Sequence, residues 1–77
     1  MQNIGSLYWK GQIQDDLEEI KELNKENKDF QVMREKYQDG ETLITIREIL
    51  FLNARCIKRL KERIEDAKAT IKGLDRV

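Results

Sequence analysis

Residues 46–74 read IREILFLNARCIKRLKERIEDAKATIKGL, and their apolar side chains recur with the spacing of a helix that packs on another helix. One row recurs every seven residues, and a second row lies three or four residues away from it. The first row is Leu50, Ile57, Ile64 and Ile71, and the second is Ile46, Asn53, Leu60, Ala67 and Leu74. Two interleaved rows of this kind form the seam of a coiled-coil helix. The sequence therefore predicts a helix over 45–73 that ends near Gly73.

A second helix is predicted over residues 12–38, because apolar residues there fall at steps of three, four and seven. They are Ile13, Leu17, Ile20, Leu23, Phe30, Met33 and Tyr37. The stripe is interrupted at NKENKD, residues 24–29, which contain no apolar side chain. The sequence leaves three alternatives for these residues: a kink, a break, or a solvent-exposed stretch of continuous helix.

The two helices are expected to fold back on each other about a turn at residues 39–44. Asp39-Gly40 is the clearest turn signal in the chain. Thr45 and Glu48 have the spacing of a capping box, although a helix start near Glu41 fits equally well. A short turn between two helices predicts an antiparallel hairpin. The predicted fold is therefore a single all-α domain over 1–77, with residues 1–11 as an N-terminal segment.

Charge favours the same hairpin. Residues 12–29 carry a net charge of −4 and residues 55–63 a net charge of +4. Folding about Gly40 places these two regions side by side. Because exposed ion pairs contribute only about 0–1 kcal/mol each, we expect the charges to set orientation more than stability.

Composition indicates that the chain needs outside support. A core built from 77 residues is marginal, and small domains usually add a disulfide, a metal or a partner. Cys56 is the single cysteine and histidine is absent, so an internal disulfide is impossible and a zinc site is not expected. The N-terminus lacks the features of a secretory signal, and the longest apolar run has four residues. We therefore expect an intracellular protein supported by other polypeptides, with no cofactor and no membrane span.

Apolar side chains lie off the seam as well as on it. Ile49, Phe51, Leu52 and Cys56 make the predicted helix apolar on nearly all sides, which is typical of a buried helix. There are two alternatives for what buries these side chains. They are packed against other subunits, or they are packed under the N-terminal segment MQNIGSLYW, whose apolar residues are Ile4, Leu7, Tyr8 and Trp9. Asn53 interrupts the seam, as a residue that fixes register or partner choice would. The expected partner interface comprises Ile49, Phe51, Leu52, Asn53, Arg55 and Cys56.

Polar residues near this patch do not suggest catalysis. Cys56 has no histidine to activate it and is interpreted as a small packed hydrophobe. Arg55, Lys58, Arg59 and Lys61 form a basic cluster with no interleaved aromatic residue. Lys58 and Lys61 each precede a glutamate by four residues, which favours paired or solvated side chains, and direct phosphate contact by the cluster is the alternative.

Two stretches resemble the first partner-of-Sld-five subunit of the GINS complex, a four-subunit assembly of the replicative helicase. LEEIKEL, residues 17–23, is similar to an early amphipathic helix of that family. LITIREILFLNARC, residues 43–56, places Asn53, Arg55 and Cys56 where the family has Asn-x-Arg-Cys. The similarity spans about residues 12–64. Arg59 and Leu60 depart from the Ala-Tyr pair that is usual in the family.

The resemblance implies a non-enzymatic scaffold that helps to hold the helicase ring to its accessory protein during DNA replication. It implies GINS-type subunits and helicase subunits as partners, and a nuclear location in a eukaryote or a cytoplasmic one otherwise. The residues themselves leave two alternatives open. One is a homodimeric helical bundle with a regulatory role, and the other is a small nucleic-acid-binding hairpin that uses the basic cluster.

Overall fold

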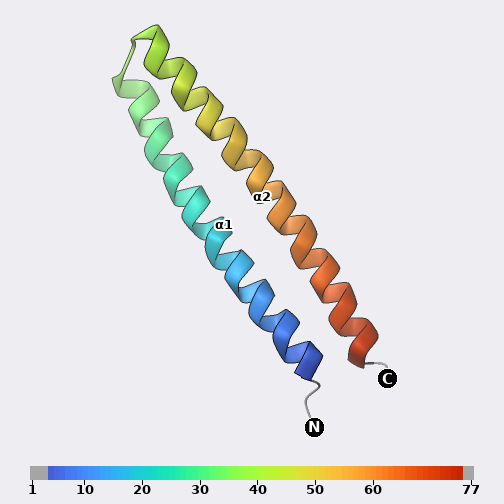
Figure 1. The fold of residues 1–77 in the computed structure, drawn as a ribbon. Coiled ribbons are helices and arrows are strands. Elements are labelled where there is room, and N and C mark those ends of the chain that lie inside the picture. The colour runs from blue at the N-terminus through green and yellow to red at the C-terminus, as the bar shows by residue number, and fades with distance from the viewer. Residues whose placement is uncertain (1–3, 76–77) are drawn as a thin grey trace.

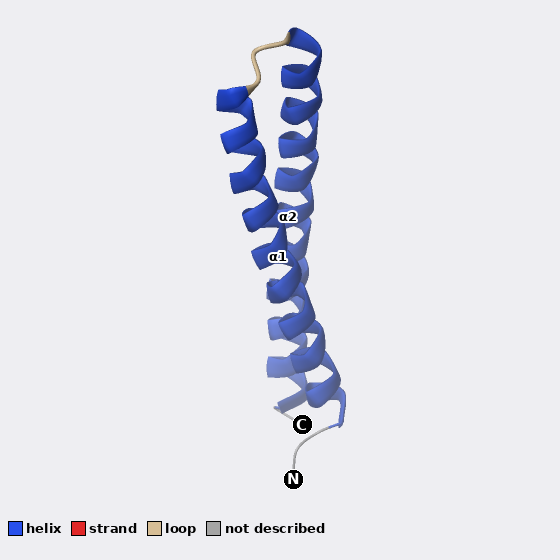
Figure 2. Cartoon of the chain, turned by 90° about the vertical axis from the view of Figure 1, so that its left-hand side faces the viewer, coloured by secondary structure: helices blue, strands red, loops and turns tan. Residues whose placement is uncertain are grey.

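The computed structural model describes residues 4–75 as two long helices packed side by side in opposite directions (Figure 1). Helix α1 spans Ile4–Lys36 and helix α2 spans Gly40–Asp75. The Cα trace measures 58 × 15 × 11 Å. In the view turned by 90°, the helices separate toward the turn and overlap toward the termini, so they cross at a shallow angle (Figure 2). The predicted all-α antiparallel hairpin is confirmed.

Helix α1 is longer at its N-terminus than predicted. Residues 4–11, expected as a separate segment, form its first turns, and residues 1–3 lie outside the described part of the chain. Gly11 lies inside this helix. A helical glycine costs only about 1 kcal/mol relative to alanine, and packing can override that. The helix is also continuous through residues 24–29, and it ends at Lys36 rather than residue 38.

Helix α2 begins at Gly40, five residues before the predicted start at residue 45 and one residue before the alternative start near Glu41. Asp39 caps it: its Oδ1 accepts the backbone N–H of Thr42 at 3.0 Å, and its Oδ2 accepts the Thr42 hydroxyl. These hydrogen bonds, the hydroxyl bond foremost, lower the pKa of Asp39 from its ordinary value. Thr45 lies inside the helix and donates to the carbonyl of Glu41 at 3.1 Å, so it is not a cap. The short loop is therefore 37–39, and α2 runs past Gly73 to Asp75.

The predicted seam of α2 is the face that α1 covers. Ile46, Leu60, Ile64 and Ala67 are buried, and the other five seam residues are half-buried. Ile20 of α1 packs with Leu60 and Ile64 at the centre of this core. Because the helices are antiparallel, a residue of α1 lies opposite the residue of α2 for which the two residue numbers add up to about 80. Ile20 and Leu60 are one such pair.

The covered face of α1 differs from the predicted stripe. Leu17, Met33 and Tyr37 were expected on it but are exposed. The face that meets α2 instead has its own seven-residue repeat with polar members. Its residues are Ser6, Trp9, Ile13, Asp16, Ile20, Leu23, Asn27 and Phe30, all of them buried or half-buried.

The hairpin leaves much of its surface in water. The accessible surface of the chain is 6415 Å², whereas a globular protein of its mass exposes about 4,900 Å². The excess of roughly 1,500 Å² arises because two helices can bury only one side of each other. This shape makes the unpaired sides of α1 and α2 the places to look for function.

Candidate partner-binding surface

The largest exposed apolar side chains of α2 lie in its first half, close to the turn. Phe51 is 62% exposed and Leu52 is 58% exposed, and Ile44 is similarly open. Consecutive helix residues point about 100° apart, so Phe51 and Leu52 face different sides of α2. Apolar surface therefore emerges on both sides of the seam near the turn.

The N-terminal residues do not cover this region. Tyr8 and Trp9 pack edge to face, with ring centroids 5.2 Å apart, at the other end of the hairpin. They line a hollow together with Arg63, Ala67 and Thr70 of α2. The alternative in which Ile4, Leu7, Tyr8 and Trp9 shield Phe51 and Leu52 is wrong for the described residues 4–9. The physical reason is that this segment continues α1 as a helix, which carries it away from the turn.

Three other residues of the expected interface have roles within the hairpin. Cys56 is half-buried and packs against the core formed by Ile20, Leu60 and Ile64, as expected of a packed thiol. Ile49 is also half-buried. The guanidinium of Arg55 lies 5.9 Å from the centre of the Phe51 ring, within the range of a cation–π contact. Phe51, Leu52 and Arg55 are thus the members of that set that remain exposed.

Asn53 lies in the seam, where its amide is engaged by α1. Its Nδ2 donates to Oδ1 of Asn27 at 2.8 Å and lies 3.3 Å from Oε1 of Glu26. The amide donors that we expected to meet a partner are therefore used inside the chain. This contact matches two polar residues across the seam, so a shift of the register by one repeat would place at least one of them against an apolar side chain.

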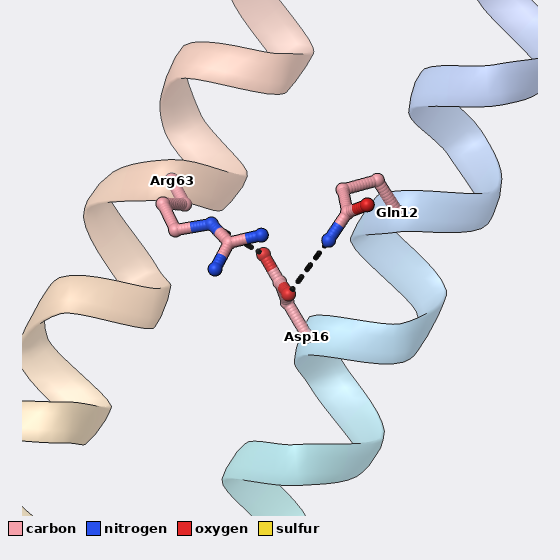
Figure 3. Close-up of polar contacts among 3 residues, drawn as sticks. All are labelled: Gln12, Asp16 and Arg63. Atoms are coloured by element: carbon pink, nitrogen blue, oxygen red, sulfur yellow. Dashed lines mark hydrogen bonds and ion pairs between the residues drawn. The ribbon is translucent and has the colours of Figure 1, made fainter.

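A buried carboxylate marks the same seam farther from the turn (Figure 3). Asp16 is 3% exposed, and its Oδ2 lies 3.5 Å from Nε of Arg63 on α2. Gln12, one turn earlier on α1, donates to Oδ1 of Asp16 at 3.3 Å. A buried carboxylate needs such partners, because an unpaired buried charge is strongly unfavourable. This is also where the acidic part of α1 meets the basic part of α2, as the charges predicted.

Asp16 was not among the predicted site residues, although the spacing contained a signal. It lies three residues after Ile13 and four before Ile20, which is the seam spacing that α2 follows. Because Asp16 is polar, a search for apolar residues at helical spacing does not include it. Asn27 was missed for the same reason.

The four residues of the basic cluster are all exposed, but they do not share one side of α2. Lys58 and Lys61, with Ala54 and Ile57, line a surface hollow. Arg59 points about 100° away from Lys58. Within residues 4–75, neither lysine forms an ion pair with the glutamate four residues later, and Glu65 instead pairs with Lys68 at 3.5 Å. The four cations are therefore exposed and spread over more than one side of α2, and phosphate contact by them stays a prediction.

Within residues 4–75, no group of three or more Cys, His, Asp or Glu side chains is placed to hold a metal ion. Neither of the two described helices is long and apolar enough to cross a membrane. Comparisons with protein-family models, with curated proteins and with solved structures found no match to this chain.

Proposed function

We propose that this chain is a non-enzymatic helical scaffold subunit that binds helices of other proteins through the apolar side chains near its turn. The observation that carries the proposal is the exposure of Phe51 and Leu52 on a helix whose first half is apolar on several sides. Single exposed apolar residues are ordinary, but several of them within one short segment of helix on a small chain favour a binding role. The unusually large surface of the hairpin supports the same interpretation.

The resemblance to the GINS complex supplies a candidate assembly for this subunit. Its two matching stretches, residues 17–23 and 43–56, belong to different helices of the hairpin. In the proposed role, α2 meets neighbouring helical subunits, and the assembly holds the replicative helicase to its accessory protein during DNA unwinding. Arg55 and Phe51 would present a combined cationic and aromatic contact to the neighbour, which is a common composition for interface anchors.

A pull-down from a native extract tests this proposal. The tagged chain is compared with Phe51→Asp, which places a charge in the exposed apolar set. Ala69→Asp is the matched control, because it adds the same charge at an exposed position far from the turn. We expect the wild type and Ala69→Asp to recover GINS-type and helicase subunits. We expect Phe51→Asp to recover at least about tenfold less of these subunits, because a carboxylate buried without a partner costs several kcal/mol.

Circular dichroism of the three purified proteins shows whether each remains helical. Equal recovery by Phe51→Asp and the wild type would remove the turn-end surface from the proposal. Recovery of helical partners other than GINS-type subunits would retain the scaffold role and reject the named assembly.

A further inference from the structure

The two broad faces of the hairpin carry opposite charge. In an antiparallel helix pair, the residues on one side of both seams form one broad face, and those on the other side form the second. The first is here called the basic face. Its cations are Lys10, Lys21, Lys28, Arg47, Lys58, Lys61, Lys68 and Lys72, and its acids are Glu35, Glu65 and Asp75. All eleven side chains are exposed, and the face has a net charge of +5.

The opposite face, here called the acidic face, has a net charge of −3. Its acids are Asp15, Glu19, Glu22, Glu26, Asp29 and Asp66, and its cations are Lys36, Arg59 and Arg63. All of these side chains are exposed as well. The zero net charge of the chain therefore hides a strong separation of charge between its two sides.

Each face also carries exposed apolar side chains in the half near the turn. Phe51 and Ile44 belong to the basic face, and Leu52 and Met33 belong to the acidic face. Exposed apolar side chains also lie far from the turn, with Leu7 on the basic face and Tyr8 on the acidic face. On both faces the charges are centred near the level of Ile20 and Leu60, which pack together.

This layout makes the basic face complementary to the acidic face of a second copy. Most cations of the basic face lie on α2, whereas five of the six acids of the acidic face lie on α1. Stacking two hairpins with their turns at opposite ends lays α2 of one copy on α1 of the other, which brings Lys58 near the level of Glu19. With the turns at the same end, α2 would lie on α2, and its lysines would meet Arg59 and Arg63 of the other copy. Pairing two like faces is disfavoured, because it would bring net charges of the same sign together.

We propose that copies of this chain associate face to face, the basic face of one on the acidic face of the next, with their turns at opposite ends. The inference rests on the proposed function, because it uses the same turn-end apolar side chains and names one partner for them. A typical stable interface removes about 800 Å² from each partner. The hairpin's surface excess of roughly 1,500 Å² is close to the area of two such faces.

Because the two interacting faces differ, the association does not close at a dimer. Such heterologous contacts extend to rings or open stacks. We therefore expect the mean mass of the wild-type chain in sedimentation experiments to rise with concentration beyond that of two chains. We also expect the association to weaken in about 1 M salt, where the screening length falls to roughly 3 Å.

Two neutralised variants test the pairing. Lys58→Gln with Lys61→Gln weakens the basic face, and Glu19→Gln with Glu22→Gln weakens the acidic face. Each variant alone is expected to sediment as a single chain where the wild type associates. An equal mixture is expected to form two-chain particles and stop there, because it contains one intact basic face and one intact acidic face. Glu18→Gln with Glu62→Gln, on the outer edges of the helices, is the control that should associate like the wild type.

Several results would overturn the inference. They are a wild type that stays monomeric, a dimer that both variants preserve, or a mixture that does not associate. A monomer whose basic face binds a DNA duplex, with binding lost in the lysine variant, would assign that face to nucleic acid instead. If helical subunits are recovered through Phe51 while self-association is absent, the proposed function stands and this inference fails.

Discussion

The half of helix α2 far from the turn and the half near it differ in how well their apolar side chains are covered. Far from the turn, Leu60, Ile64 and Ala67 are buried under α1, and Asp16 is held by Arg63. Near the turn, Ile46 is buried, but Phe51 and Leu52 are open. Both halves of α2 continue the same seven-residue seam. The difference comes from side chains off the seam, which are mostly charged far from the turn and mostly apolar close to it.

This difference indicates that one half contributes mainly to stability and the other mainly to exposed apolar surface. The distal half supplies the stability that a two-helix structure can generate, from a few well-packed aliphatic residues and one polar anchor. The half near the turn buries Ile46 but leaves Phe51 and Leu52 exposed, and the proposed function assigns these side chains to the binding of other helices. A pair of substitutions, one in each half, can therefore separate stability from association.

The largest expected effect comes from shortening the same residue type in the two halves. Leu60 is 4% exposed, and Leu60→Ala should lower the free energy of unfolding by about 2–4 kcal/mol through lost burial and a cavity. Leu52→Ala, at an exposed position, should change it by less than about 0.5 kcal/mol. Urea unfolding followed by circular dichroism measures both. Similar losses in the two variants would mean that the halves are equally packed and would remove the contrast.

An intermediate effect is expected at the polar anchor of the distal half. Arg63→Met keeps the apolar stem but leaves Asp16 with Gln12 alone, and should cost about 1–2 kcal/mol of unfolding free energy. The value is moderate because the Arg63 side chain is half-exposed and the pair is partly screened. Combining Arg63→Met with Asp16→Leu should recover most of the loss, because an apolar pair of similar size replaces the charge. No recovery in the urea midpoint would show that Asp16 has a role beyond this contact.

The smallest effect is expected at the turn, where Asp39 caps α2. Hydrogen bonds from Thr42 lower its pKa, so the ionised carboxylate is favoured in the folded state. A lowered folded-state pKa adds stability above the unfolded-state value, and this contribution is lost as the pH falls through the folded-state value. Asp39→Asn provides the control, because asparagine caps a helix without titrating. The wild-type urea midpoint should fall relative to that of Asp39→Asn between pH 5 and pH 2, and a constant difference would contradict the cap.

The seam of α2 was fully predictable because its repeat is regular and nearly all apolar, so each of its nine positions was placed correctly. The face of α1 was harder to predict. Leu17 fits an apolar stripe with Ile13 and Ile20 but points away from α2, whereas Asp16 is buried. Of the expected interface, Phe51, Leu52 and Arg55 are exposed, while Asn53 and Cys56 are engaged inside the hairpin. A pattern based on hydrophobicity alone could not assign an aspartate and an asparagine to a helix contact.

The sequence by itself determined the two helices, the turn at Asp39-Gly40 and the covered side of α2. These depend on local propensity, on a capping side chain and on a repeat that continues over many turns. Only the tertiary structure decided how α1 is rotated about its own axis, because its apolar stripe is interrupted at residues 24–29 and several rotations bury similar numbers of aliphatic groups. Matching Asn27 to Asn53 and Asp16 to Arg63 favours one rotation, since another would cover Asn53 in the seam without its partner on α1. The tertiary structure also decided that residues 4–11 continue α1 as a helix, which carries them away from the turn and leaves Phe51 exposed.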